Sequence, residues 1–277
     1  MSTRSCGREK DGAKLEDRYD RQRFLLGAEG MSRLRDTHVA LYGLGGSGAS
    51  IALQLAYLGV GRLTIVDPDT VESSNLNRQV LYGYEDVGRL KIDAARDRLQ
   101  AVDSDVEVVA KMRHTAESLP ERIQEYSLVI DATDEYRFKV ALDRACRAAG
   151  VPMIHTSAIG LRGTVVTFSD QQSSYEIFFE LPTRGRSLNH VSDDEIESRR
   201  KRVIRAMVGE LYGDELTDHV IAGRVDYQTF VAAPSVAAGV VTSEVIRLIM
   251  GQSPLYGPGN PFHFDLATGY FTTGVCQ

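Results

Sequence analysis

The chain has 277 residues, of which 43% are hydrophobic and 25% are charged, and it contains no tryptophan. This length and composition are ordinary for a globular protein and allow one large α/β domain or two small ones. The net charge of −6 argues against a general nucleic-acid binder, because phosphate backbones are bound by positive surfaces.

The N-terminal residues, the cysteines and the most apolar stretch bear on location. Residues 1–15 are polar and charged, so we predict a disordered tail rather than a signal peptide. The three cysteines, Cys6, Cys146 and Cys276, are far apart and form no paired pattern, which is typical of the reducing cytoplasm. Residues 230–241 are apolar but contain a proline and are far fewer than the ~20 that span a membrane. We therefore expect a cytoplasmic protein that binds no membrane and no nucleic acid.

The first regular pattern in chain order is a strand, a glycine-rich turn, a helix and a second strand. Residues 38–42 predict a buried strand, and apolar side chains at helical spacing predict a helix over 47–58. Gly59 then stands where a C-terminal cap is expected. Residues 63–66 predict a second strand that ends at Asp67. This unit is typical of the opening of a Rossmann-like doubly wound sheet.

The alternation of strands and helices continues through most of the remaining chain. Helices are expected at 91–102, 135–149 and 234–250, and strands at 106–109, 128–130, 151–155, 163–168 and 262–265. The sequence therefore predicts an α/β fold with a doubly wound, mostly parallel sheet and antiparallel C-terminal strands.

Residues 170–228 interrupt this rhythm, because they are polar and strongly charged. Within them Ser192 and Glu195 match a capping box, in which each side chain accepts from a free backbone N–H of the other, so a charged helix should run to about Leu211. We predict a single domain over residues 16–277, with 170–228 as a charged helical insertion.

The glycine-rich turn after the first strand is the most informative single motif. Gly43, Gly45 and Gly48 match GxGxxG, and Gly46 lies inside it. Such glycines permit a tight turn and let backbone N–H groups at a helix N-terminus approach phosphates closely. Asp67 ends the next strand, where a carboxylate can bind ribose hydroxyls. The motif predicts a bound nucleotide but does not distinguish NAD from ATP.

Polar side chains in the loop after the second strand favour ATP. Asn75, Arg78 and Gln79 lie within five residues of one another, and a nicotinamide enzyme has no need for them there. Arg78 can make forked contacts with a triphosphate, and the two amides can hydrogen-bond ribose or phosphate oxygens.

Charged residues further along the chain add to this interpretation. Lys91 starts a predicted helix and can offer a point charge to a phosphate. Asp134 follows a predicted parallel strand and is a candidate Mg²⁺ ligand. Asp131, at the end of that strand, either faces the same crevice or caps the next turn.

Together these motifs resemble the E1-like activating enzymes, the ThiF/MoeB/HesA type of adenylyltransferase. The motifs that carry the resemblance are, in order, residues 18–22, 43–48, 67–71, 75–79, 86–91, 131–134, 151–154, 158–163 and 233–234. They cover most of residues 18–168 and 230–270, and their order and spacing make the resemblance specific.

The resemblance implies a site, a reaction and an assembly. Asp67 and Asp69 would hold the adenosine side of ATP, and Asp134 would bind Mg²⁺. The phosphates and ribose would be contacted by Asn75, Arg78, Gln79 and Lys91. Arg21 resembles the family's arginine finger, a catalytic group that reaches the ATP of the other subunit, and so implies a homodimer. A carboxylate would attack the α-phosphate and release pyrophosphate, and it needs no general base because it is already an anion.

The chain departs from the family where many relatives bind structural zinc or carry a reactive thiol. Residues 156–275 contain no cysteine, so we predict no zinc and expect the chemistry to stop at an acyl-adenylate or to pass directly to an external nucleophile. Cys146 is expected in the core. The basic cluster at 199–205 is expected to be a solvated helix face, a docking site for an acidic partner or a cover over the site.

These observations leave several functions open. The first is adenylation of the C-terminal glycine of a ubiquitin-like or sulfur-carrier protein. The second is activation of a peptide or small-molecule carboxylate in cofactor or natural-product biosynthesis, which the missing zinc and thiol favour. An NAD-dependent oxidoreductase is disfavoured because it leaves Arg78, Lys91 and Asp134 unexplained, and a non-catalytic scaffold is disfavoured because the ATP-site residues are all present. The sequence does not identify the carboxylate or its final acceptor.

Overall fold

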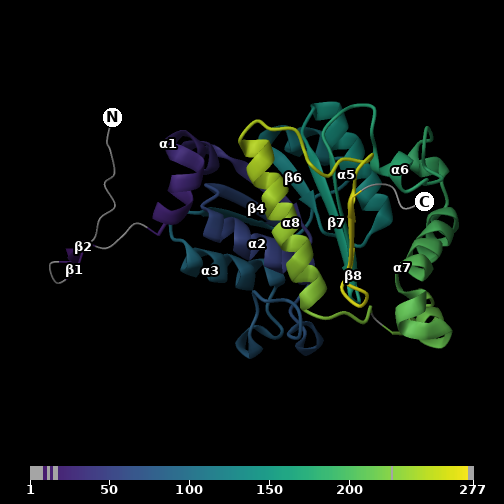
Figure 1. Ribbon diagram of the computed structural model, residues 1–277. Helices are drawn as coiled ribbons and strands as arrows, with labels where there is room; N and C mark the ends of the chain where they lie inside the picture. Colours follow the sequence, from purple (N-terminus) through teal and green to yellow (C-terminus); the bar gives the residue numbers. More distant parts are fainter. Residues whose placement is uncertain (1–8, 11–12, 15–17, 226, 274–277) are drawn as a thin grey trace.

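An eight-stranded sheet forms the centre of the molecule (Figure 1), in the strand order β10-β9-β8-β7-β6-β3-β4-β5. The computed structural model describes residues 9–10, 13–14, 18–225 and 227–273. The strands of the sheet are β3 (His38–Tyr42), β4 (Arg62–Val66), β5 (Glu107–Lys111), β6 (Leu128–Asp131), β7 (Met153–Ile159), β8 (Arg162–Phe168), β9 (Phe262–Asp265) and β10 (Tyr270–Thr273).

The sheet is parallel in one half and antiparallel in the other. β5, β4, β3, β6 and β7 run parallel, whereas β8, β9 and β10 are each antiparallel to the preceding strand in space. The prediction of a doubly wound, mostly parallel sheet with antiparallel C-terminal strands is therefore confirmed. All five residues of β3 are buried, as expected for a strand covered by helices on both faces.

Helices cover both faces of this sheet. Their bounds are α1 (Asp20–Asp36), α2 (Gly46–Leu58), α3 (Lys91–Val102), α4 (Leu119–Arg122), α5 (Tyr136–Ala149), α6 (Tyr175–Phe178), α7 (Asp193–Ile221) and α8 (Ala232–Ile249). Short 3₁₀ helices lie at η1 (Ser73–Asn75), η2 (Tyr84–Asp86), η3 (Ile123–Glu125) and η4 (Leu188–His190). In Figure 1, α2, α3 and α8 lie in front of the sheet and α5 lies behind it.

Alternate side chains of β3 enter two separate cores, as the two-residue period of a strand requires. Val39 and Leu41 belong to the core shared with α2, α3 and α8. Ala40 and Tyr42 belong to the core shared with α5. The chain thus leaves β3 toward one face and leaves β6 toward the other. A crevice opens at the carboxyl ends of these neighbouring strands, which is where ligands bind in open α/β sheets.

Helix α8 is long and apolar enough, by length and composition, to cross a membrane. It packs against α2 and against strands β7 and β8, with Ala237, Val241 and Val245 fully buried. The buried part of its apolar surface, 39% of the helix, therefore belongs to the core.

The segment 170–228 leaves the sheet after β8 and returns to the sheet layer at α8. Ser192 and Glu195 form the predicted capping box at the start of α7. The segment is fastened to α5 by Arg137, which donates to Asp193 Oδ1 at 2.7 Å and to the carbonyl of Val191 at 2.8 Å. That residues 16–277 form a single domain, with 170–228 as an insertion in it, stays a prediction.

The structure adds three elements that the sequence analysis did not place. The charged helix expected to run to about Leu211 is interrupted at Gly213, whose φ of 74° is not helical, and a second helical stretch then completes α7 to Ile221. A further strand, β10, follows the one expected to be last. Helix α1 had no clear sequence signal. Of the predicted disordered tail, only 9–10 and 13–14 are described, as a short antiparallel pair, and the other residues lie outside the described part.

The buried carboxyl group of Asp143 on α5 predicts a pH-dependent stability. Burial raises the pKa of Asp143 to about 6, against the opposing effects of the Tyr175 N–H and the Arg147 guanidinium. Because the folded state binds the proton of this carboxyl group more tightly than the unfolded state, Asp143 by itself gives the free energy of unfolding a downward slope as pH rises from about 4 to 6. Asp143→Asn should remove this slope, worth up to about 3 kcal/mol. Urea denaturation at pH 4.5 and 7.5 checks this, and an equal slope in both proteins would contradict it.

Candidate functional site

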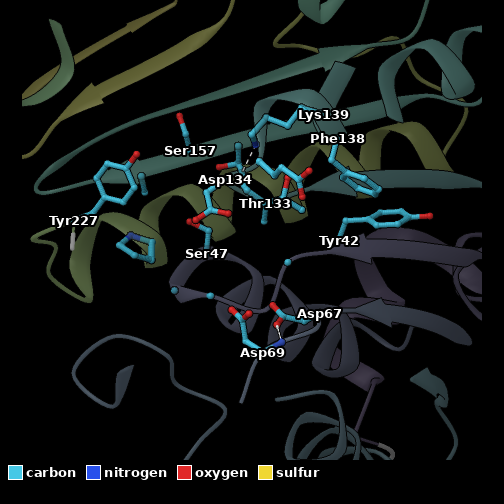
Figure 2. Close-up of a pocket in the computed structure, with 18 of the residues that line it drawn as sticks. Tyr42, Ser47, Asp67, Asp69, Thr133, Asp134, Phe138, Lys139, Ser157 and Tyr227 are labelled. Carbon is cyan, nitrogen blue, oxygen red and sulfur yellow. Dashed lines mark hydrogen bonds between the residues drawn. The ribbon is translucent and has the colours of Figure 1, made fainter. Parts of the chain in front are cut away.

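A cavity of about 760 Å³ lies at the carboxyl ends of β3, β4 and β6. Figure 2 shows Asp67 and Asp69 on one side of it and Asp134, Lys139 and Tyr227 on the other. The predicted site residues that line this cavity are Gly43, Gly45, Gly46, Asp67, Asp69, Asn75, Arg78, Gln79, Lys91 and Asp134. Two predicted site residues do not line it. Gly48 packs against the carbonyl of Gly43 within the glycine loop, and Arg21 lies outside the cavity.

The glycines of the loop differ in their steric surroundings. Gly43 has φ 90°, and a Cβ there would lie 2.5 Å from the carbonyl oxygen of Ala132 on the neighbouring turn. At Gly48 a Cβ would lie 1.9 Å from the Gly43 carbonyl oxygen. Gly45 differs, because a Cβ there would meet no atom within 4 Å. The loop is therefore closely packed on its inner side and open at Gly45, beside the N-terminus of α2.

The open face of the loop suits a phosphate group. Gly45 is the N-cap of α2 and supplies no side-chain acceptor for the free backbone N–H groups of the first turn. Such groups, together with the helix dipole, attract anions. Gln79 is buried at the same cavity, and its Oε1 has no hydrogen-bond partner among the described residues. A nucleotide would thus meet groups that the described part of the protein leaves unsatisfied.

Asp67 anchors the glycine loop to the end of β4. Its Oδ2 accepts from the backbone N–H of Leu44 at 2.6 Å, and its Oδ1 accepts from the N–H of Asp69 at 2.9 Å. Burial raises the pKa of Asp67, while Lys91 and these backbone donors oppose the rise. Both oxygens therefore bond the protein backbone, and the more exposed carboxylate at this end of the cavity is that of Asp69.

Lys91 is buried at the start of α3, with its charge directed to these two carboxylates. Its Nζ lies 2.9 Å from Asp69 Oδ2 and 4.0 Å from Asp67 Oδ1. An exposed surface lysine would not be fixed by two carboxylates in this way. The arrangement holds a desolvated cation at the cavity wall, where an anionic ligand would feel it strongly.

The loop around η1 orients the remaining polar residues. Arg78 Nη1 donates to the carbonyl of Ser74 at 2.8 Å and to Asn77 Oδ1 at 2.9 Å. Asn75 is buried, and its Oδ1 accepts from the backbone N–H of Glu72 at 3.1 Å. Asn75 therefore shapes the loop, whereas Arg78 lines the cavity without a carboxylate partner among the described residues.

Asp131 caps the turn that follows β6, which was one of its two expected roles. Its Oδ1 accepts from both the backbone N–H and the hydroxyl of Thr133, at 3.1 and 2.7 Å. Its Oδ2 accepts from Lys139 Nζ at 2.9 Å and pairs with His155 Nδ1 at 2.7 Å. Although burial alone would raise the pKa of Asp131, Lys139 and His155 hold it below its ordinary range.

Asp134 follows this turn and lies exposed in the cavity. Across the described ranges, no hydrogen bond or ion pair engages its carboxylate, so it is free to bind a cation. Among the residues the structure describes, no group of three or more His, Cys, Asp or Glu side chains is arranged to hold a metal. A Mg²⁺ ion at Asp134 would therefore need oxygen ligands from a bound nucleotide, which is how this ion is commonly held. Cys276 lies outside the described residues, and Cys146 is buried as expected.

Sequence reasoning missed Lys139 and His155. Lys139 had a detectable signal, because it lies on the buried stripe of α5 with Leu142 and Cys146, where a charge needs a partner. His155 had none, because its contact depends on β6 and β7 pairing with Asp131 beside His155.

The far end of the cavity is lined by side chains of the segment 170–228. Tyr175, Phe179, Ile204 and Tyr227 contribute aromatic and aliphatic surface there. Tyr227 is held by Arg200, whose Nη1 donates to the phenol oxygen at 2.5 Å. The basic cluster is thus partly internal, because Arg200 is also paired with Glu197. The segment therefore forms one wall of the site.

Arg21 lies on the exposed surface of α1, away from the cavity of its own chain. Large apolar side chains stand beside it in sequence, and Phe24 and Leu25 are 93% and 83% exposed. Such neighbouring apolar side chains are typical of a surface that another protein covers.

Comparisons with known proteins agree with this geometry. The ThiF family matches residues 19–274. The molybdopterin-synthase adenylyltransferase of Escherichia coli K12 is 38% identical over 61% of this chain and 72% of its own length. The sulfur carrier protein ThiS adenylyltransferase of the same strain is 36% identical, over 55% of this chain and 62% of its own length.

Solved structures of similar fold cover more of the chain. The crystal structure of PaaA matches with a TM-score of 0.70 and 25% identity, over 92% of this chain and 81% of that protein. The Escherichia coli protein MccB, solved with MccA-N7isoASN, matches with a TM-score of 0.71 over 94% of this chain and 72% of its own. At 19% identity the MccB match establishes the fold alone.

Proposed function

Because the chain belongs to the ThiF family and is an enzyme of the E1-like adenylyltransferase type, we propose that it activates a carboxylate by ATP-dependent adenylation. In this reaction a carboxylate oxygen bonds to the α-phosphorus of ATP. The bond from that phosphorus to the bridging oxygen breaks, and pyrophosphate leaves with the electron pair. The products are an acyl-adenylate and pyrophosphate.

The protein's task in this reaction is to position two anions and to stabilise the charge of the leaving group. The glycine loop and the N-terminus of α2 would bind the phosphates, and Arg78 and Lys91 would offset the charge of the pyrophosphate. Asp134 would hold Mg²⁺, which when bound supplies further positive charge beside the phosphates. No proton needs to be removed from the nucleophile, because carboxylates are ionised at neutral pH.

The observation that carries the proposal is the convergence of Arg78, Lys91 and Asp134 on one cavity with an open glycine loop. Hydride transfer to or from a nicotinamide needs neither the two cations nor the free carboxylate. The NAD-dependent oxidoreductase therefore stays the disfavoured alternative.

We propose that the carboxylate is the C-terminal glycine of a ubiquitin-like or sulfur-carrier protein. The two named adenylyltransferases of Escherichia coli support this choice. A peptide or small-molecule carboxylate is the alternative, and the wall of Phe179, Ile204 and Tyr227 favours it, because a bulky apolar wall gives a side chain on the acyl group something to pack against. We also propose that the enzyme is cytoplasmic and binds no zinc.

Exchange of labelled pyrophosphate into ATP separates these substrates. Exchange only with a small protein that ends in Gly-Gly supports the carrier, whereas exchange with a short peptide or small acid supports the alternative. Tight binding of NADH without binding of ATP would contradict both.

We further propose a homodimer in which Arg21 reaches the ATP of the partner subunit. The exposed Phe24 and Leu25 beside it support burial of this part of α1 between two copies. Arg21 is not among the residues that line the cavity of its own chain, which fits a role in the partner's site.

Mixing two inactive variants tests this assembly. Arg21→Ala and Lys91→Ala, purified separately and exchanged into mixed dimers, should regain activity, because one site then contains both intact residues. In a two-fold dimer that site would restore about half of the wild-type exchange per mixed dimer. Absence of rescue in dimers verified as mixed would count against the shared site.

A further inference from the structure

The side chain of Lys139 lies almost fully buried between the sheet and the cavity, with 3% of it exposed. Its Nζ donates to two acceptors on the turn after β6, Asp131 Oδ2 at 2.9 Å and the carbonyl oxygen of Thr133 at 2.6 Å. Lys139 comes from α5, so these bonds tie the helix to the turn. The chemistry proposed above gives this lysine no role.

The same turn is closed from its other side by Asp131. One oxygen of that carboxylate accepts twice from Thr133, and the other accepts from Lys139 and pairs with His155. Lys139, Asp131 and Thr133 therefore form a closed ring of hydrogen bonds. Figure 2 shows Lys139 directed toward this turn, with Asp134 next to it at the cavity.

The bond to the Thr133 carbonyl has a direct consequence for Asp134. The carbonyl of Thr133 and the N–H of Asp134 belong to one planar peptide unit, so a bond that fixes the oxygen also fixes the orientation of the unit. No described residue holds the carboxylate of Asp134 through a hydrogen bond or an ion pair. Its direction therefore depends on the backbone that precedes it.

We propose that Lys139 is a positioning residue that fixes the Thr133–Asp134 peptide and so directs Asp134 toward the Mg²⁺ that accompanies ATP. This rests on the proposed function, because it takes Asp134 as the Mg²⁺ ligand. Lys139 itself touches neither the metal nor the reacting atoms. Replacing a group that orients a metal ligand commonly lowers metal affinity by about 10- to 100-fold.

The dependence of ATP binding on Mg²⁺ tests this role apart from catalysis. ATP affinity would be measured by calorimetry with Mg²⁺ and again with EDTA, and the ratio of the two would be compared between proteins. In Lys139→Met we expect this ratio to fall by about 10- to 100-fold, while affinity in EDTA changes little. Asp134→Asn should lower the ratio by a similar factor, and Lys139→Arg should recover part of it.

Mn²⁺ provides a second, spectroscopic readout. The EPR spectrum of Mn²⁺ with ATP and the wild-type protein should change when Lys139 is replaced by methionine, because the environment of the ion changes. An identical spectrum would overturn the proposal.

A matched control separates positioning from general stability. Arg144 lies five residues further along α5 and pairs with the buried Glu176 at 2.7 Å, but it does not line the cavity. Arg144→Met should therefore lower the melting temperature and leave the Mg²⁺ ratio unchanged. The proposal would be refuted if the ratio of ATP affinity with Mg²⁺ to that with EDTA fell in Arg144→Met. It would also be refuted if this ratio stayed at the wild-type value in Lys139→Met.

The loss of one partner of a buried ion pair can prevent folding, so a second variant is needed. Asp131→Asn combined with Lys139→Met removes both charges and keeps an acceptor for Thr133. This protein should show the same loss of the Mg²⁺ ratio, and a wild-type ratio in it would overturn the proposal. A wild-type protein that binds no ATP at all would instead refute the proposed function on which this one depends.

Discussion

Replacing Lys91 with alanine should lower the rate of pyrophosphate exchange roughly 100- to 1,000-fold. The ammonium group lies 2.9 Å from Asp69 and 4.0 Å from Asp67, at the wall of the cavity. Without it, two carboxylates face the incoming triphosphate with no nearby cation of their own, so like charges repel. The change should affect the rate of the chemical step, because charge on the leaving pyrophosphate is greatest in the transition state.

Lys111 provides a matched control for this prediction. It ends β5, pairs in register with Val66 at the same edge of the sheet, and is exposed outside the cavity. Lys111→Ala should therefore retain wild-type exchange. Equal rates in Lys91→Ala and the wild-type protein would show that Lys91 only stabilises the loop of Asp69.

Adding one methyl group at Gly45 or at Gly48 should weaken ATP binding in both cases but destabilise the fold only at Gly48. At Gly48 the new Cβ would lie 1.9 Å from the Gly43 carbonyl oxygen, so the backbone must move. We expect Gly48→Ala to lose about 1–3 kcal/mol of stability, and ATP binding with it. At Gly45 the methyl group meets no protein atom within 4 Å, so Gly45→Ala should fold normally.

The second half of this comparison tests where the phosphates bind. A methyl group at Gly45 would occupy the open face of the loop, and ATP affinity should fall about tenfold or more, equivalent to about 1.4 kcal/mol. Thermal melting and calorimetric ATP titration of the two variants provide the measurements. Unchanged ATP affinity in a fully folded Gly45→Ala protein would show that the phosphates do not bind at this loop.

Much of the fold could be predicted because its central elements carry local signals. The buried strand at 38–42 and the glycines that end α2 and α5 in left-handed conformations are visible in the sequence. Helix α1 was not, because Gly27 interrupts it and only its second half packs on the core. The length of α7 depends on packing of Val220 against Ile204 and Val208, a contact between parts of the helix on either side of a bend.

The site was predictable where motifs follow strand ends, and it was not where contacts depend on strand pairing. Arg78, Lys91 and Asp134 line one cavity because the carboxyl ends of parallel strands meet at one edge. Asp67 bonds the backbone of the glycine loop, a contact that the motif alone does not reveal. The aromatic wall, which includes Tyr227, comes from a segment without regular patterning, so no sequence motif predicted it.

The products formed from ATP labelled at the α-phosphate, in the presence of a panel of Gly-Gly proteins, peptides and small acids, test the central claim most directly. The account predicts that, with Mg²⁺ and one class of carboxylate, the label enters an acyl-adenylate or AMP while pyrophosphate is released. Release of labelled ADP with that carboxylate would contradict it, because cleavage would then have occurred between the β- and γ-phosphates.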